Sequence, residues 1–260
     1  MPKDKIATNE QYLKKLVEDQ EPLGKQVENL NTLSNRLGQF IQKRFKDQTI
    51  LYYGGSKERN TLLRERPDLN IGIFWSENCD KTLEEIHALV GKSLKKKWSK
   101  TIAKNIGWEV MYKEDFYFSV IPGMIANSET QMALFYWESE EELIETSLKL
   151  QDEYVKENDR GNIVRLLKLW KLRKKVPISD FVLELMCINA CKGINRNEIE
   201  KQASRMFNYF HENIDKTNVY DPINNQILIS NIMNEEAKQE TKNIALEALQ
   251  ADNWGKVFKK

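Results

Sequence analysis

The chain has 260 residues, which suits one large domain or two small ones, and 40% of them are hydrophobic, enough to form a core. Its 40 basic and 39 acidic side chains nearly cancel, so the overall charge gives no reason to expect a nucleic-acid partner. No apolar run reaches the roughly 20 residues that cross a bilayer, and the polar start MPKDKIATNEQ is unlike a signal peptide. The three cysteines lack disulfide or zinc spacing. We therefore expect a cytoplasmic protein with no membrane partner.

The first part of the chain has the pattern of a long helix followed by strands. Apolar residues recur every three or four positions from Leu23 to Phe45, which predicts that the N-terminal stretch to Lys46 is helical. Four later apolar runs are typical of strands: Thr49–Tyr53, Ile71–Trp75, Trp108–Tyr112 and Phe116–Ile121. Residues Glu84–Ala103, between the second and third of these runs, have a helical pattern instead.

Helical patterns dominate the second part of the chain. Strand signals largely vanish from Glu138 onward, and the periodicity predicts helices at Asn162–Leu172, Phe181–Ala190 and Glu198–Asn213. The sequence therefore predicts an α+β fold, in which a mixed sheet with helices precedes a helical domain and a long N-terminal helix bridges both. The predicted division is residues 1–48 for the N-terminal helical segment, 49–137 for the α/β core and 138–260 for the helical domain.

The most informative segment is the turn Gly54-Gly55-Ser56, which is followed twelve positions later by Asp68 at the start of an apolar strand. Paired glycines let the backbone turn sharply and approach a ligand closely. The serine offers a hydroxyl and backbone N–H groups of the kind that hold phosphate. Asp68 and Asn70 share one face of the predicted strand, because side chains alternate along a strand. Gly-Gly-Ser alone could form an ordinary turn before a strand. The presence of Asp68 at this spacing favours a phosphate-binding loop instead.

This segment resembles the active-site segment of oligoadenylate synthases and of the bacterial CD-NTases, relatives of cyclic GMP–AMP synthase. The resemblance begins with Gly-Gly-Ser, Thr61 and the run LLRERPDLN that ends at Asn70. Further segments match in the same order: FSVIPG at Phe118–Gly123, RLLKLWK at Arg165–Lys171, SDFVLEL at Ser179–Leu185 and DPINN at Asp221–Asn225. Together they cover about residues 50–235. The resemblance implies a polymerase-β-like nucleotidyltransferase core followed by a helical domain.

The chain departs from this family at the expected metal ligands. The resemblance maps the three catalytic carboxylates to Asp68, Asn70 and Ser119, so Asp68 is the one predicted metal ligand that keeps its carboxylate. Three carboxylates would hold two Mg²⁺ ions for attack on the α-phosphate of a nucleotide, and the loss of two removes most of the charge that holds the ions. Glu109 or Asp115 would substitute if the register differs. Mg²⁺ or Mn²⁺ is therefore expected as a cofactor only if the chain is active.

The resemblance also implies contacts with the nucleotide. Arg165 and Lys168 lie three positions apart on one predicted helix and share a face, with Lys171 one turn further. A solvated basic face is the alternative for such a pattern, and the matching neighbours favour contact with a triphosphate. The nucleotide-binding residues expected from the resemblance are Gly54, Gly55, Ser56, Thr61, Arg165, Lys168, Lys171 and Ser179.

Three hypotheses about function follow. The first is a pseudoenzyme that binds a nucleoside triphosphate or a nucleotide signal and engages an effector protein as its partner. The second is a pure interaction scaffold that binds no nucleotide, and the retained phosphate-binding residues argue against it. The alternative is a synthase, active or deliberately inactivated, that joins nucleotides into an oligonucleotide or cyclic second messenger. The resemblance implies bacterial antiphage defence as the setting. The lysines from Lys92 to Lys104 match a solvated helix as well as a nucleic-acid surface, so nucleic acid is a weaker candidate partner.

Overall fold

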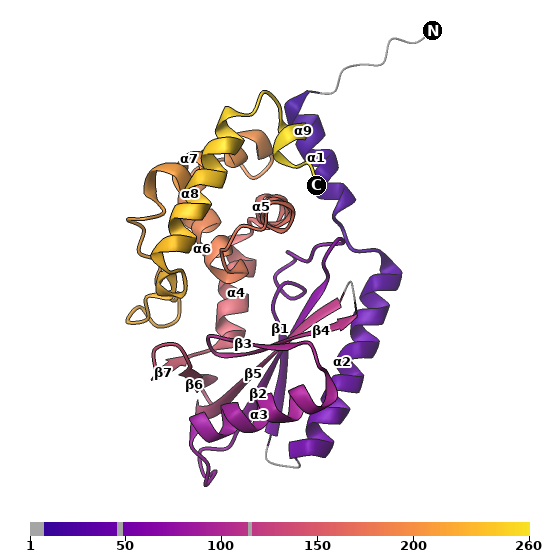
Figure 1. Cartoon of the computed structure of the whole chain (residues 1–260), viewed down its shortest axis with the longest axis vertical. Helices are drawn as coiled ribbons and strands as arrows, with labels where there is room; N and C mark the ends of the chain where they lie inside the picture. The colour runs from indigo at the N-terminus through magenta and orange to yellow at the C-terminus, as the bar shows by residue number, and fades with distance from the viewer. Residues whose placement is uncertain (1–7, 46–48, 114–115) are drawn as a thin grey trace. The chain divides into compact units, whose positions relative to one another are not determined.

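The computed structural model of the chain describes residues 8–45, 49–113 and 116–260, to which the following description refers. The chain divides into two compact units (Figure 1). The helical unit comprises Met1–Glu21, Val155–Tyr220 and Leu228–Lys260, and the sheet unit comprises Pro22–Tyr154 and Asp221–Ile227. Each unit therefore combines segments that are distant in sequence. The predicted domain boundaries after residues 48 and 137 stay a prediction.

The sheet unit is built on a seven-stranded mixed sheet. Its strands are β1 Thr49–Gly54, β2 Asp68–Trp75, β3 Thr101–Lys104, β4 Gly107–Lys113, β5 Phe116–Asn127, β6 Met132–Trp137 and β7 Glu142–Thr146. Five strands follow the order β1-β2-β5-β4-β3, while β6 pairs with the second half of β5 and with β7. Strands β2 and β5 pair in parallel, and the other pairs are antiparallel.

The two faces of this sheet differ in character. Alternate residues of β2, such as Ile71 and Ile73, belong to a buried core with residues of α2 (Gly24–Phe45) and α3 (Leu83–Lys97). Figure 1 shows these two helices beside the strands of the unit. The intervening residues of β2 point to the opposite face, which we call the polar face. Its central residues are Asp68 and Asn70 in β2, Tyr117 and Ser119 in β5, and Glu109 in β4.

The helical unit is assembled from short helices around a buried α5. Its elements are α1 Asn9–Asp19, α5 Gly161–Lys174, α6 Asp180–Ala190, α7 Ile199–Asn213, the 3₁₀ helix η2 Ile229–Ile232, α8 Glu235–Gln250 and α9 Trp254–Val257. Helix α4, Leu148–Asn158, begins in the sheet unit and ends in the helical unit. Thr8, Ser179 and Asn234 cap α1, α6 and α8 by accepting a hydrogen bond from a backbone N–H three residues further on. On α5, Trp170 is fully buried and stacks on Phe210, with ring centroids 5.7 Å apart.

The predicted α+β fold class is confirmed, and the four predicted strands correspond to β1, β2, β4 and β5. The sequence patterns do not predict β3, β6 or β7. The helix predicted to end at Ala103 ends at Lys97, and that part of the prediction is wrong. Thr101 and Ile102 instead begin β3, which pairs with β4. The β-branched side chains of these two residues favour a strand over a helix.

The predicted N-terminal helical stretch consists of two helices, of which α2 is the long one with 22 residues. Pro22 lies between α1 and α2; it has no backbone N–H to donate, so a helix does not continue through it. Leu23 precedes α2 and is 49% exposed, so it is not part of the apolar stripe predicted from Leu23 to Phe45. Because α1 belongs to the helical unit and α2 to the sheet unit, this N-terminal stretch contributes to both.

Candidate functional site

The Gly-Gly-Ser segment follows β1 and turns sharply toward β2. Gly55 has a φ of +87°, and a Cβ atom built there would lie 2.4 Å from the side-chain nitrogen of Asn70. Any other residue at this position would be strained and would displace Asn70. Thr61 is buried, and its N–H donates a hydrogen bond of 2.9 Å to the Ser56 carbonyl, which closes the turn. The predicted sharp glycine turn is therefore present at Gly55, and the role of Gly55 in nucleotide binding stays a prediction.

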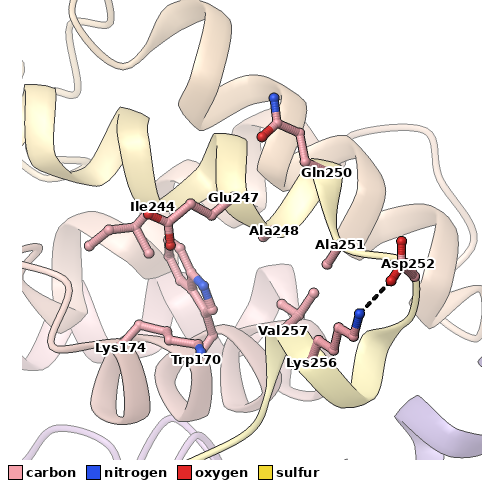
Figure 2. Close-up of a pocket in the computed structure, with 10 residues that line it drawn as sticks. All are labelled: Trp170, Lys174, Ile244, Glu247, Ala248, Gln250, Ala251, Asp252, Lys256 and Val257. Carbon is pink, nitrogen blue, oxygen red and sulfur yellow. Dashed lines mark hydrogen bonds and ion pairs between the residues drawn. The ribbon is translucent and has the colours of Figure 1, made fainter.

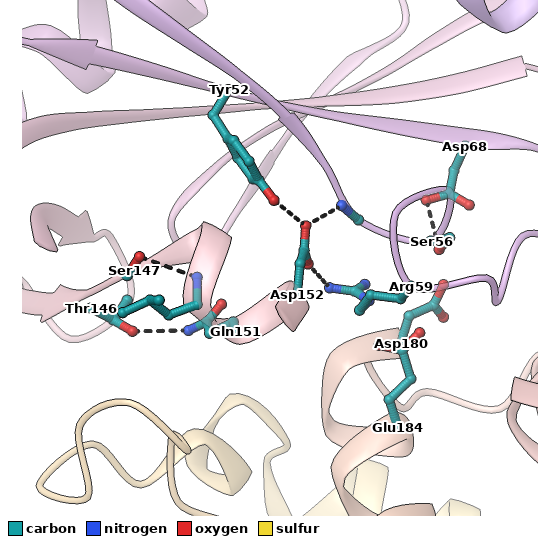
Figure 3. A network of polar contacts seen from close by, with 12 residues as sticks. Tyr52, Ser56, Arg59, Asp68, Thr146, Ser147, Gln151, Asp152, Asp180 and Glu184 are labelled. Carbon is teal, nitrogen blue, oxygen red and sulfur yellow. Dashed lines mark hydrogen bonds and ion pairs between the residues drawn. The ribbon is translucent and has the colours of Figure 1, made fainter. Parts of the chain in front are cut away.

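A buried carboxylate that the sequence patterns do not single out holds this loop. Asp152 Oδ2 accepts hydrogen bonds from the Gly55 N–H and the Tyr52 hydroxyl, both at 2.8 Å, and Oδ1 accepts one from Arg59 at 2.7 Å. Figure 3 shows Tyr52 and Arg59 pointing toward Asp152. The side chains of Arg59 and Asp152 are each 7% exposed, so they form a buried ion pair. Burial and the charge of Asp152 raise the pKa of Tyr52, which keeps its hydroxyl protonated as a donor.

The register of the sheet brings the three predicted catalytic positions together on the polar face. Asp68 and Asn70 lie two positions apart on β2, and Asn70 is the register partner of Ser119 on β5. Neighbouring strands are separated by about 4.8 Å, so side chains in one row reach a common ligand. Glu109 on β4 is the register partner of Ser119 and continues the same row. Asp115, the other substitute considered for a metal ligand, lies outside the described residues.

The predicted basic residues of α5 are neutralised within the helical unit. Lys168 is 4% exposed, and its Nζ lies 3.0 Å from Asp180 Oδ2 and 4.0 Å from Glu184 Oε1. Lys171 pairs with the other carboxylate oxygen of Asp180. Burial alone would raise the pKa of Asp180, but Lys168 and Lys171 outweigh burial and lower this pKa. A carboxylate of the chain therefore occupies the lysines that the resemblance assigns to a triphosphate.

Two further predicted nucleotide contacts also have partners in the helical unit. The side chain of Arg165 is 11% exposed, and its Nη1 lies 3.9 Å from Glu21 Oε1. Ser179 begins α6, where its Oγ accepts a hydrogen bond of 3.2 Å from the Val182 N–H. This cap uses the acceptor side of the hydroxyl and leaves its proton for another acceptor. The proposed roles of Arg165 and Ser179 in nucleotide binding stay predictions.

Comparison with known proteins identifies the fold. No protein-family model matches the sequence, and no curated protein is significantly similar to it. A structure of CdnC from E. coli MS115-1 with ATP has a TM-score of 0.72 and 15% identity to the chain, over 97% of this chain and 98% of that one. The CD-NTase CdnG of Bradyrhizobium diazoefficiens in complex with GTP has a TM-score of 0.73 and 10% identity, over 94% and 92% of the two chains. The chain has the CD-NTase fold.

A third similar structure is the CdnC:HORMA-deltaN complex of E. coli MS115-1, with a TM-score of 0.69 and 16% identity over 96% of this chain and 97% of that one. At such identities the CD-NTase likeness concerns the fold, and the roles of single residues stay predictions. No helix among the described residues is long and apolar enough to cross a membrane.

The residues at the three predicted catalytic positions do not fit a two-metal centre. Asp68 carries the one carboxylate, and its Oδ2 already accepts a hydrogen bond of 3.1 Å from Ser56 Oγ. The amide of Asn70 and the hydroxyl of Ser119 are neutral and bind hard divalent ions weakly. Glu109 shares their row, but its carboxylate pairs with two basic side chains. Throughout residues 8–45, 49–113 and 116–260, no group of three or more His, Cys, Asp or Glu side chains is placed to hold a metal ion.

A cavity of about 360 Å³ lies in the helical unit among α5, α8 and α9 (Figure 2). Its volume is in the range of small-molecule pockets, roughly 300–1,000 Å³. Trp170, Ala248 and Val257 give it apolar walls, and Lys174 and Glu247 add charge. The predicted nucleotide contacts on α5 are not among the residues that line it. The cavity is therefore separate from the predicted nucleotide contacts.

Several other polar or reactive side chains have structural roles. His87 stacks on Trp108 with ring centroids 4.9 Å apart, and burial lowers the pKa of the imidazole. Lys95, one of the lysines between Lys92 and Lys104, lies over the same Trp108 ring, with its Nζ 4.6 Å from the ring centroid. Cys187 and Cys191 are fully buried, and burial raises the pKa of both thiols. These side chains are therefore poor candidates for acid–base or nucleophilic catalysis.

The Asp-Pro segment of the resemblance also supports the fold. Asp221 is 3% exposed, and its Oδ2 accepts hydrogen bonds from Thr146 Oγ1 at 2.7 Å and from Gln151 Nε2 at 2.6 Å. Its Oδ1 accepts the Ile223 N–H at 2.8 Å. These bonds attach the short segment Asp221–Ile227 to the end of β7 and the start of α4, so the motif stabilises the sheet unit.

Proposed function

We propose that the chain binds a nucleoside triphosphate or a nucleotide signal on the polar face of the sheet unit, beside the Gly-Gly-Ser loop, and that it is impaired as a nucleotidyltransferase. The observation that carries this proposal is the register that groups Asp68, Asn70 and Ser119 with one carboxylate among them. The glycine-dependent turn at Gly55 supports ligand binding, because its shape is built in before any ligand arrives.

The missing carboxylates support the loss of catalysis. Nucleotidyl transfer depends on positioning and on cations that stabilise the negative charge of the transferring phosphate. Bound metal ions supply most of this positive charge. Removing one element of such stabilisation costs about 10²–10³ in rate, and two are missing here. Asp68, together with the Ser56 hydroxyl that donates to it, orients a ligand on this face without supplying such cations.

The comparisons suggest the biological setting. The fold is shared by CdnC, solved with ATP and in a complex with HORMA-deltaN, and by CdnG, solved with GTP. By analogy, this chain binds a purine nucleoside triphosphate, acts in bacterial antiphage nucleotide signalling and passes the presence of its ligand to an effector protein. This analogy rests on fold, so the nucleotide and the partner have to be found by experiment.

Turnover of α-labelled ribo- and deoxyribonucleoside triphosphates in Mg²⁺ or Mn²⁺ tests the proposal. The unmodified chain is compared with the double variant Asn70→Asp plus Ser119→Asp, and the two single variants serve as matched controls. We expect product from the double variant, because it restores all three carboxylates on the polar face, and none from the unmodified chain. Equilibrium dialysis with labelled ATP and GTP measures binding in parallel. Product from the unmodified chain would contradict the impairment, and a lack of binding would contradict the ligand.

An active synthase is the second candidate, and the position of Glu109 favours it. Glu109 is the register partner of Ser119, so a carboxylate lies one strand away from the place where the family has its third. If the unmodified chain makes product, Glu109→Gln is expected to abolish it, because Asp68 would then lack its partner carboxylate. Product that persists in Glu109→Gln would exclude this arrangement.

A further inference from the structure

Two basic side chains lie on the polar face beside Glu109, which is one strand away from Ser119. Arg66 Nη2 is 3.5 Å from Glu109 Oε2, and Lys104 Nζ is 3.5 Å from Glu109 Oε1. Glu109 is the register partner of Ser119, so this three-residue ion-pair cluster adjoins a position that the family gives to a metal ligand. The residues Arg66, Glu109 and Lys104 are called the cation cluster below.

Arg66 also extends over the neighbouring row of the polar face. Its Cζ lies 4.0 Å from the centroid of the Tyr117 ring, and Tyr117 is the register partner of Asp68. Stacking on an aromatic ring fixes the plane of a guanidinium and leaves its N–H groups directed outward. The guanidinium is therefore held close to both rows in which the catalytic positions lie.

The charge on this face differs from that of a metal-dependent site. Three carboxylates without metal would repel a triphosphate, and bound divalent ions would be needed to reverse the charge. Here Arg66 and Lys104 both pair with Glu109, so these three side chains carry one net positive charge, which offsets the single negative charge of Asp68. These four side chains together carry no net charge, so a triphosphate meets two cations there before any metal ion binds.

The ion pairs of the cation cluster are also easy to exchange. The side chains of Arg66, Lys104 and Glu109 are 34%, 50% and 20% exposed. Ion pairs exposed to this degree contribute little to stability, because water screens them. Arg66 and Lys104 therefore exchange Glu109 for a phosphate group at little cost, and the resulting charge-assisted hydrogen bonds are strong.

We infer that the chain binds its nucleoside triphosphate without a divalent cation, and that Arg66 and Lys104 supply the positive charge. The inference rests on the proposed function, since it concerns the same face and the same ligand. It predicts that metal-free ATP binds at least as tightly as Mg²⁺-bound ATP, because Mg²⁺ neutralises part of the ligand charge that the two cations recognise.

Isothermal titration calorimetry with ATP, in Mg²⁺ and in EDTA, tests the inference on the full chain. The unmodified chain should bind ATP in EDTA with a Kd equal to or below the Kd in Mg²⁺. The double variant Arg66→Gln plus Lys104→Gln should weaken binding in EDTA by about tenfold or more, because it removes two charge-assisted contacts. Lys96→Gln is the matched control, since Lys96 is an exposed residue of α3, a helix that packs on the opposite face. This control should change Kd by less than about twofold.

Glu109→Gln keeps the inference testable if the double variant folds poorly. This substitution frees both cations from their carboxylate partner and should tighten ATP binding in EDTA by about threefold. Misfolding does not produce tighter binding. The second candidate function expects the same variant to lose product formation, so the two ideas give different results for one substitution.

The outcomes separate the inference from the proposed function. ATP binding that requires Mg²⁺ overturns the inference and leaves the proposed function intact. ATP binding in neither buffer overturns both. Metal-independent binding that the double variant weakens no more than Lys96→Gln does, with no gain in Glu109→Gln, overturns the assignment to Arg66 and Lys104.

Discussion

Asp152 of the sheet unit and Asp180 of the helical unit play similar parts in two places where the sequence resembles a nucleotide-binding protein. Asp152 accepts the N–H of Gly55 in the predicted phosphate loop. Asp180 pairs with Lys168 and Lys171, the predicted triphosphate contacts on α5. In each place, a carboxylate of the chain already engages a group that the resemblance assigns to a ligand.

The surroundings of the two carboxylates differ. Asp152 is 7% exposed and accepts from a backbone N–H, a hydroxyl and a guanidinium, so it is part of the loop architecture. Asp180 is 33% exposed and interacts chiefly with two ammonium groups, which a phosphate would also attract. Asp152 therefore holds the shape of the Gly-Gly-Ser loop, whereas we expect Asp180 to compete with a ligand for Lys168 and Lys171. The predictions below test this difference.

Asp152→Ala should have the largest effect, because it leaves the buried Arg59 without its carboxylate. Breaking a buried ion pair by removing one partner costs about 3–5 kcal/mol, and the free energy of unfolding should fall by this amount. Urea denaturation measures it. Glu153→Ala is the matched control, since Glu153 is 49% exposed on the same helix, and it should cost less than about 0.5 kcal/mol. Equal losses for the two variants would show that Asp152 does not build the loop.

Asp180→Asn should lower the free energy of unfolding by about 1–2 kcal/mol at neutral pH, a value between those for surface and buried ion pairs. The two lysines outweigh burial and hold the folded-state pKa of Asp180 below its ordinary value of 3.8. Its contribution to stability is therefore complete above the unfolded-state pKa and is lost as the pH falls through the folded-state pKa. The difference in unfolding free energy between the unmodified chain and the variant should shrink below about pH 4. A difference that stays constant from neutral to acid pH would argue against the ion pairs.

The sequence predicts the arrangement of the polar face well, because strand alternation is a local rule. Asp68 and Asn70 follow from the spacing along one strand, and Ser119 follows from the aligned motif on the next. The role of Asp152 cannot be predicted from the sequence, because Asp152 contacts Gly55 from 97 positions away and its segment resembles any amphipathic helix. The sequence pattern also does not reveal the strand that contains Lys104, since this strand follows a lysine-rich helix whose periodic pattern continues to Ala103.

The charge partners are the part of the site that sequence spacing does not reveal. Arg66, which precedes β2, meets Glu109 of β4 because both strands pair with β5 in a fixed register. A shift of β4 by one residue would send Glu109 to the other face. Lys168 and Asp180 meet across two helices that pack together. Such pairs depend on tertiary packing, so they appear only once the fold is known.

Affinity for ATP should move in opposite directions when the two carboxylates are neutralised. Asp180→Asn should tighten binding by about fivefold if Lys168 and Lys171 contact the nucleotide, because a competing anion is removed. Asp152→Asn should weaken binding, because the Gly55 N–H loses a charged acceptor and the loop loses its fixed shape. Calorimetry under one set of conditions compares the variants. Weaker binding in Asp180→Asn would mean that the lysines of α5 serve the fold alone.

Ser179 of the helical unit gives the smallest expected effect. Ser179 caps α6 through its Oγ, which accepts the Val182 N–H. Ser179→Ala should lower the free energy of unfolding by about 1 kcal/mol, whereas Ser179→Asn should leave it unchanged within a few tenths of a kcal/mol, since asparagine caps helices equally well. Urea denaturation measures both variants, and ATP titration accompanies it. If Ser179→Ala keeps its stability but binds ATP more weakly, the hydroxyl contacts the ligand instead of the helix, and Asp180 beside it then lies at the nucleotide as well.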